Sequence, residues 1–228
     1  MDSGSIVLGG LSGIMVGLAL ALLSGTVGAF LGPAGAEAVR RRFFGARVAI
    51  DFRLEPPWCH LTSTAGGWPV FYFRFSIKNE GRSQARRCEA VLEGLSVRDA
   101  AGQYVREANF FGVNLVWSVI GSQVTDLNPE RRLYCDIGFI PDVGRQDVYF
   151  QERPEFRQGD RQQSNFFFSQ SVFPFVQKSY VGPGSYEIEV VVYSENAPTV
   201  RQRFRIDWSG RWRQDEKEMF REIVITGR

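Results

Sequence analysis

The sequence predicts a mainly β protein, in which one N-terminal transmembrane helix precedes an antiparallel β-sandwich and a short C-terminal helix follows it. Three observations support this prediction. The stretch 6–31 is apolar and carries no charged residue, side chains alternate with period two after residue 48, and turn-forming residues separate the alternating runs. A hydrophobic content of 44%, a charged content of 23% and a net charge of +2 are typical of a globular chain without a strongly charged partner.

These patterns divide the chain into five parts. The predicted boundaries are a short tail at 1–5, a transmembrane helix at 6–31, a basic juxtamembrane linker at 32–47, a β-sandwich domain at 48–213, and a C-terminal helix and tail at 214–228.

The stretch 6–31 exceeds the roughly 20 apolar residues that cross a bilayer as a helix. A cleaved signal peptide is the alternative interpretation, and the small residues of 33–36 would suit a signal peptidase. Such a peptide has a basic start and a shorter apolar run of about 7–15 residues, whereas this chain begins Met-Asp-Ser-Gly-Ser.

Arginines after the apolar stretch predict its orientation and a contact with the membrane surface. Arg40, Arg41, Arg42 and Arg47 follow it, while Asp2 is the only charged side chain before it. Because positive residues beside a span tend to stay in the cytoplasm, we expect residues 37–228 there, with the arginines near the anionic leaflet. The alternative is an exported domain that faces outward and binds an extracytoplasmic partner or ligand.

Small residues recur at every fourth position inside the apolar stretch. Residues four apart share a helix face, and small side chains let two membrane helices approach closely, so this stripe predicts self-association or pairing with another helix. Its members are Gly9, Gly13, Gly17, Ala21, Gly25 and Ala29. The general abundance of Gly and Ala in membrane helices is the simpler explanation.

Alternating apolar and polar side chains predict strands with one buried face, which is typical of antiparallel sheets. The runs begin at 48, 71, 133, 186 and 200. Turns are expected at 79–81, 101–102, 128–129, 182–184 and 196–198, where Gly, Asn and Pro gather.

Two stretches depart from the alternation. Residues 151–178 contain an aromatic cluster that either forms a strand in the core or offers a partner-binding surface. Its members are Phe166, Phe167, Phe168, Phe173 and Phe175. Residues 214–222 contain good helix formers and predict the short C-terminal helix.

The segment 73–92 resembles the second and third strands of immunoglobulin-like domains of the CARDB type. In those domains a strand ends in an Asn-x-Gly turn and an alanine leads into the next strand, and Asn79, Gly81 and Ala85 occupy these places. The stretch 184–212 is similar to the final hairpin of uncharacterised membrane-anchored domains. This resemblance implies an immunoglobulin-like interaction module and supplies no catalytic residue.

Arginines 201, 203 and 205 would line one face of the last hairpin, opposite Glu187 and Glu189. Pairing residue 190 with 204 would place Glu189 opposite Arg205 and Glu187 opposite Asp207. We expect a solvated face of mixed charge rather than a nucleic-acid surface.

Candidate catalytic groups are few. The chain has one histidine and three cysteines, which excludes a His₂, His₃ or Cys₄ metal site within it. Cys59 and His60 are adjacent, so on an extended chain they would point to opposite faces and serve nucleophilic catalysis poorly; we expect them in a packed loop. Cys88 and Cys135 are expected to pack in the core. Solvated turns are expected for Asp126, Glu130, Asp136 and Asp142, which lack the spacing of a metal-binding loop.

The sequence therefore predicts a non-enzymatic interaction or scaffolding protein at the cytoplasmic face of the cell membrane. We expect a protein partner or a homo-oligomer formed through the transmembrane helix, with no cofactor, no metal, no nucleic acid and no small-molecule substrate.

Overall fold

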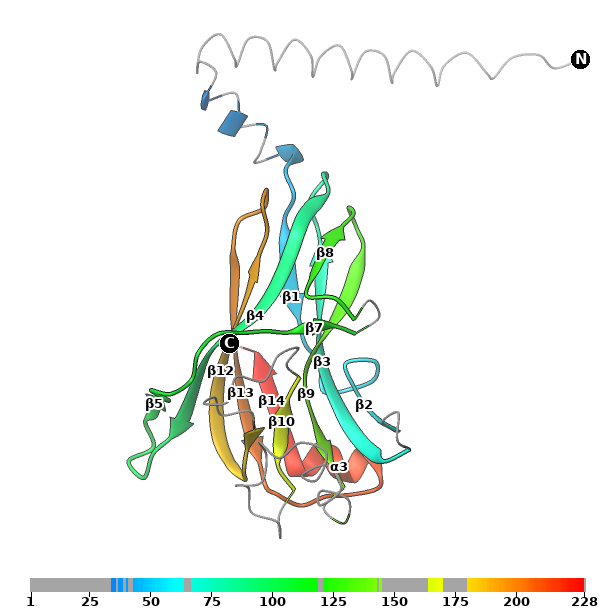
Figure 1. The fold of residues 1–228 in the computed structure, drawn as a ribbon, viewed down its shortest axis with the longest axis vertical. Coiled ribbons are helices and arrows are strands. Elements are labelled where there is room, and N and C mark those ends of the chain that lie inside the picture. The colour runs from blue at the N-terminus through cyan, green and yellow to red at the C-terminus, as the bar shows by residue number, and fades with distance from the viewer. Residues whose placement is uncertain are drawn as a thin grey trace, which may run out of the picture. The chain divides into compact units, whose positions relative to one another are not determined.

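A computed structural model describes residues 34–35, 37–38, 40, 43–63, 67–118, 121–142, 144, 164–169 and 180–227. The chain separates into two compact units, residues 1–45 and residues 46–228. The second unit contains two antiparallel sheets packed as a β-sandwich, and this confirms the mainly β, antiparallel sandwich part of the predicted fold (Figure 1).

The first sheet has the strand order β1-β3-β9-β10-β11 in the described part of the chain, with β2 paired to β3 and β7 paired to β9. Its strands are β1 (Val48–Asp51), β2 (Cys59–Ser63), β3 (Pro69–Asn79), β7 (Val116–Trp117), β9 (Arg132–Pro141), β10 (Phe166–Phe168) and β11 (Tyr180–Val181).

The second sheet has the order β14-β13-β12-β4-β5 over the same described ranges, with β6 and β8 also paired to β4. Its strands are β4 (Ala85–Arg98), β5 (Tyr104–Arg106), β6 (Val113–Asn114), β8 (Val124–Leu127), β12 (Gly184–Tyr193), β13 (Val200–Trp208) and β14 (Ile223–Gly227). Figure 1 shows the long strands β4 and β12 running side by side, as their antiparallel pairing requires.

The core forms from the inward-facing residues of both sheets. Phe71, Phe73 and Phe75 alternate along β3 with outward polar neighbours, and all three are fully buried. The ring of Phe75 stacks on Phe204 of the second sheet with 6.1 Å between centroids. Burying such a side chain contributes about 1.5–3 kcal/mol, so these contacts hold the two sheets together.

Asn79 joins three segments at the turn between β3 and β4. Its Oδ1 accepts hydrogen bonds from the backbone N–H groups of Arg47 (3.2 Å) and Gly81 (2.9 Å). Its Nδ2 donates to the carbonyl oxygens of Ser83 and Leu127, both at 2.8 Å. The turn predicted at 79–81 thus carries the chain from the first sheet to the second.

The C-terminal residues form the predicted helix and, after it, a strand that was not predicted. The expected helix is present as α3 (Glu216–Glu222), with Asp215 as its N-cap. The predicted tail is instead strand β14, which pairs with β13 along its whole length. Ile223 and Ile225 are buried in the core, and this burial accounts for the strand.

Candidate functional site

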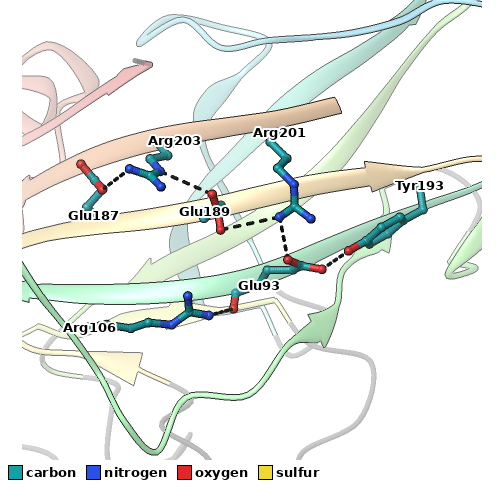
Figure 2. Close-up of polar contacts among 7 residues, drawn as sticks. All are labelled: Glu93, Arg106, Glu187, Glu189, Tyr193, Arg201 and Arg203. Atoms are coloured by element: carbon teal, nitrogen blue, oxygen red, sulfur yellow. Dashed lines mark hydrogen bonds and ion pairs between the residues drawn. The ribbon is translucent and has the colours of Figure 1, made fainter. Parts of the chain in front are cut away.

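Charged side chains cross four neighbouring strands on the outer face of the second sheet. Figure 2 shows them in a row from β13 through β12 and β4 to β5. We call this set the charged face; its members are Glu93, Arg106, Glu187, Glu189, Tyr193, Arg201 and Arg203. Because successive side chains of a strand point to opposite faces, the inward neighbours on β12, such as Ile188 and Val190, belong to the core.

The register of β12 and β13 sets the charge pattern. Glu189 lies opposite Arg203, and Glu187 lies opposite Arg205. The predicted register, with Glu189 opposite Arg205, is wrong by two residues. Its weakness was the like-charge pair of Glu187 with Asp207, and the observed register puts an arginine opposite each of the two glutamates instead.

Ion pairs connect the strands across this face (Figure 2). Arg201 Nη1 lies 2.9 Å from Glu93 Oε2 and 3.8 Å from Glu189 Oε2. Arg203 Nε lies 3.4 Å from Glu189 Oε1, and its Nη1 lies 3.8 Å from Glu187 Oε1. Each arginine therefore bridges two carboxylates, and the row forms one continuous network.

Glu93 is the centre of this network on β4. Its carboxylate accepts a hydrogen bond from the hydroxyl of Tyr193, and its backbone carbonyl accepts one from Arg106 Nη2 at 3.1 Å. The hydrogen bond from Tyr193, followed by that from Arg201, lowers the pKa of Glu93. The same contact with Glu93 raises the pKa of Tyr193, so the carboxylate and the neutral phenol are both favoured.

The carboxylates and the guanidinium groups differ in depth. The side chains of Glu93, Glu189 and Glu187 are 27%, 20% and 17% exposed, whereas those of Arg201 and Arg203 are 51% and 60% exposed. The acidic groups thus form an inner layer, and the arginines form the layer that meets solvent. A guanidinium has five N–H donors, so pairing with the inner layer leaves donors available to an incoming acceptor.

A second polar cluster lies on the first sheet, where β2, β3 and β9 are neighbours. Arg74 Nη2 lies 3.4 Å from His60 Nε2, and Arg74 Nε lies 3.8 Å from Asp136 Oδ1. Ser118 Oγ donates to Asp136 Oδ1 at 2.6 Å. The prediction of a solvated turn for Asp136 is wrong, since it belongs to β9.

Burial governs the ionisation of this second cluster. It raises the pKa of Asp136, although the hydrogen bond from Ser118 and the charge of Arg74 oppose the increase. Burial and the charge of Arg74 lower the pKa of His60, which favours the neutral imidazole. Sequence reasoning missed the cluster because its members come from separate strands, and no local motif connects them.

The cysteines belong to the core. Cys59 and His60 lie at the start of β2 rather than in the expected loop, and their side chains point to opposite faces as alternation requires. Cys59, Cys88 and Cys135 are fully buried. Burial raises the pKa of Cys59 to about 12 and that of Cys88 to about 11, so both remain protonated thiols at neutral pH.

The aromatic cluster divides between packing and undescribed residues. Phe166, Phe167 and Phe168 form β10 and are at most 1% exposed, so they do not offer the partner surface that the sequence allowed. Phe166 and Phe168 pack in the main core, and Phe167 packs against Val70 and Phe139 in a second apolar cluster. Phe173 and Phe175 lie outside the described residues.

The predicted membrane residues are described only in part. Arg40 Nε pairs with Glu37 at 3.0 Å, and Arg47 Nη2 pairs with Glu80 at 3.2 Å; both arginines remain largely exposed. Arg41, Arg42 and the whole stripe from Gly9 to Ala29 fall among the residues that the structure does not describe. Within the described ranges, no helix combines the length and the apolar character that a membrane crossing needs.

In the part of the chain that the structure describes, no group of three or more His, Cys, Asp or Glu could hold a metal ion. An open surface cavity of about 230 Å³ is lined by Arg213, Glu218, Arg221 and Glu222, and Arg213 and Glu222 pair at 2.8 Å.

Comparison of the chain with protein-family models and with curated proteins found no match.

Proposed function

We propose that this chain is a single-pass membrane protein whose immunoglobulin-like β-sandwich contacts a protein partner at the cytoplasmic face. The contact surface is the charged face, and one observation carries this assignment. Arg201 and Arg203 expose their guanidinium groups above an inner layer of partly buried carboxylates.

The chemistry of protein interfaces supports this surface. Arginine and tyrosine are enriched where proteins bind one another, and both occur here on one face of a sheet. Pairing with the glutamates restricts the arginine side chains before any partner arrives, so less conformational entropy is lost on binding. A partner that presents carboxylates or backbone carbonyls could accept hydrogen bonds from the outer arginine layer.

The membrane part of the proposal is supported by sequence. The uncharged stretch 6–31 supplies the anchor, its stripe of small residues supports self-association, and the arginines that follow favour the cytoplasmic side. The immunoglobulin-like assignment is supported by the Asn-x-Gly turn, which connects strands of opposite sheets through Asn79.

A cysteine substitution can test the sidedness. The native cysteines are fully buried, so an impermeant thiol reagent would spare them on either side of the membrane. Phe111 is 62% exposed, and Phe111→Cys provides an accessible thiol on the sandwich. Protection of this thiol in intact cells, with labelling after lysis, is the expected result; labelling of intact cells would favour the exported alternative.

An affinity pull-down of the full chain from native membranes tests the contact surface. We expect Arg201→Gln combined with Arg203→Gln to reduce recovery of the partner about ten-fold, because interface arginines are frequent hot spots. The matched control is Arg87→Gln, which removes a different exposed ion pair, with Glu195 at 3.1 Å. Equal recovery by the double variant and the control would contradict the proposed surface.

A further inference from the structure

Two adjacent phenylalanines are exposed just before the sandwich begins. Phe43 is 64% exposed and Phe44 is 46% exposed, and both lie in helical backbone. Single exposed apolar residues are common on protein surfaces and need no explanation. Phe43 and Phe44 differ from such isolated residues because two exposed rings follow one another directly in the first compact unit, next to a run of arginines in the sequence.

Basic residues directly precede these rings. The sequence from residue 40 reads Arg-Arg-Arg-Phe-Phe, and Arg40 is largely exposed beside its partner Glu37. Aromatic rings favour the boundary between lipid headgroups and acyl chains, while arginines are attracted to anionic headgroups. Basic and aromatic side chains together are typical of segments that lie on a membrane surface.

The predicted membrane span lies close enough to supply that surface. Twelve positions separate Leu31 from Phe43 in the sequence, which span about 18 Å as a helix and at most about 43 Å when fully extended. A bilayer held by 6–31 would therefore never be farther than this from the rings. This short tether gives the membrane a high effective concentration compared with any freely diffusing partner.

We propose that Phe43 and Phe44 insert into the headgroup region of an anionic bilayer, with Arg40 beside them at the phosphate level. The juxtamembrane segment is then an interfacial anchor that holds the start of the sandwich at the membrane, instead of a linker in water. This inference rests on the proposed membrane anchoring by 6–31.

Site-specific fluorescence of the full chain in vesicles tests this anchor. The vesicles contain phosphatidylcholine with about 30% phosphatidylglycerol, which supplies the anionic surface. An environment-sensitive dye is attached to Phe43→Cys, and the buried native thiols are spared. The matched control carries the dye at Phe111→Cys, which replaces a phenylalanine of similar exposure, 62%, in the sandwich.

The expected result is a blue-shifted emission at position 43 that lipid-attached quenchers reduce about three-fold more than the emission at position 111. The difference in quenching between positions 43 and 111 should become smaller in vesicles of phosphatidylcholine alone. It should also become smaller when Arg40, Arg41 and Arg42 are replaced by glutamine.

Three other outcomes would overturn the inference in distinguishable ways. If the protein floats with the vesicles but the dye at position 43 shows no blue shift, the dye is in water. This result refutes the interfacial anchor and leaves the proposed membrane span standing. A blue shift that lipid quenchers do not reach shows that protein covers the rings. Protein that does not float with vesicles refutes the proposed membrane anchoring itself.

Discussion

Replacing Asn79 with alanine should destabilise the sandwich strongly, because this side chain makes four hydrogen bonds to backbone groups. Asn79 is completely buried, and its partners belong to three separate segments of the chain. Asn79→Ala would remove the Oδ1 atom, which accepts hydrogen bonds from two backbone N–H groups. It would also remove the Nδ2 group, which donates hydrogen bonds to two backbone carbonyls. The protein would have to leave these groups unpaired or admit water to the turn.

The expected loss follows from the burial of the four partners. An unsatisfied buried polar group costs about 1–3 kcal/mol. The bond to the carbonyl of Leu127 is buried, and the other three are partly buried and can regain water in part. A loss of about 3–4 kcal/mol in the free energy of unfolding is therefore expected, or a decrease of about 6–16 °C in Tm for a domain of this size.

Thermal unfolding of the full chain in detergent, followed by tryptophan fluorescence, measures this loss, since Trp117 and Trp208 are buried in the core. The matched control is Asn128→Ala. The exposed Oδ1 of Asn128 accepts one bond from Gln84 Nε2 at 3.0 Å, and its loss should change stability by less than about 0.5 kcal/mol. If both variants melt within about 2 °C of each other, the reasoning from buried hydrogen bonds is refuted.

Three further predictions concern the core and its ionisable groups. Gly138→Ala should cost about 3 kcal/mol in chemical denaturation, because the new Cβ would collide with the backbone carbonyl of Phe167; a cost below about 1 kcal/mol would contradict the packing of β10. Burial raises the folded-state pKa of Asp136, so the stability that this carboxyl contributes is present below its unfolded pKa of about 3.9 and is lost as pH rises through the folded pKa. Asp136→Asn should therefore gain stability relative to the parent as pH rises in that window, and parallel unfolding curves from acid to neutral pH would argue against it. The thiols of Cys59 and Cys88 should resist labelling at pH 8 in the native protein and react in denaturant, and labelling of native protein followed by mass spectrometry checks this.

Local patterns in the sequence predicted part of the sandwich. Alternation identified β1, β3, β9, β12 and β13 and the buried face of β3, because side chains alternate between core and solvent along a strand with one exposed face. The longest strand, β4, was not among the alternating runs and was indicated only by the resemblance of 73–92 to immunoglobulin-like domains. All five expected turns connect strands, since Gly, Asn and Pro favour turn conformations wherever they occur. The C-terminal helix was located to within two residues of its start, 214 against Glu216.

Much of the candidate site required the tertiary structure. The sequence pointed to arginines and glutamates on one hairpin, but it did not reveal that Glu93 of β4 and Arg106 of β5 would join them. The cluster of His60, Arg74 and Asp136 depends in the same way on β2, β3 and β9 being neighbours.

The sequence by itself determined which residues alternate, where the chain turns and which stretch is apolar enough to enter a membrane. Only the tertiary structure decided the register of β12 on β13, the pairing of β14 and the burial of Phe166–Phe168. The physical reason is the range of the interactions. Periodicity and turn preference depend on residues close in sequence. Strand register and side-chain burial depend on contacts between distant segments, and these contacts form together when the sheets pack.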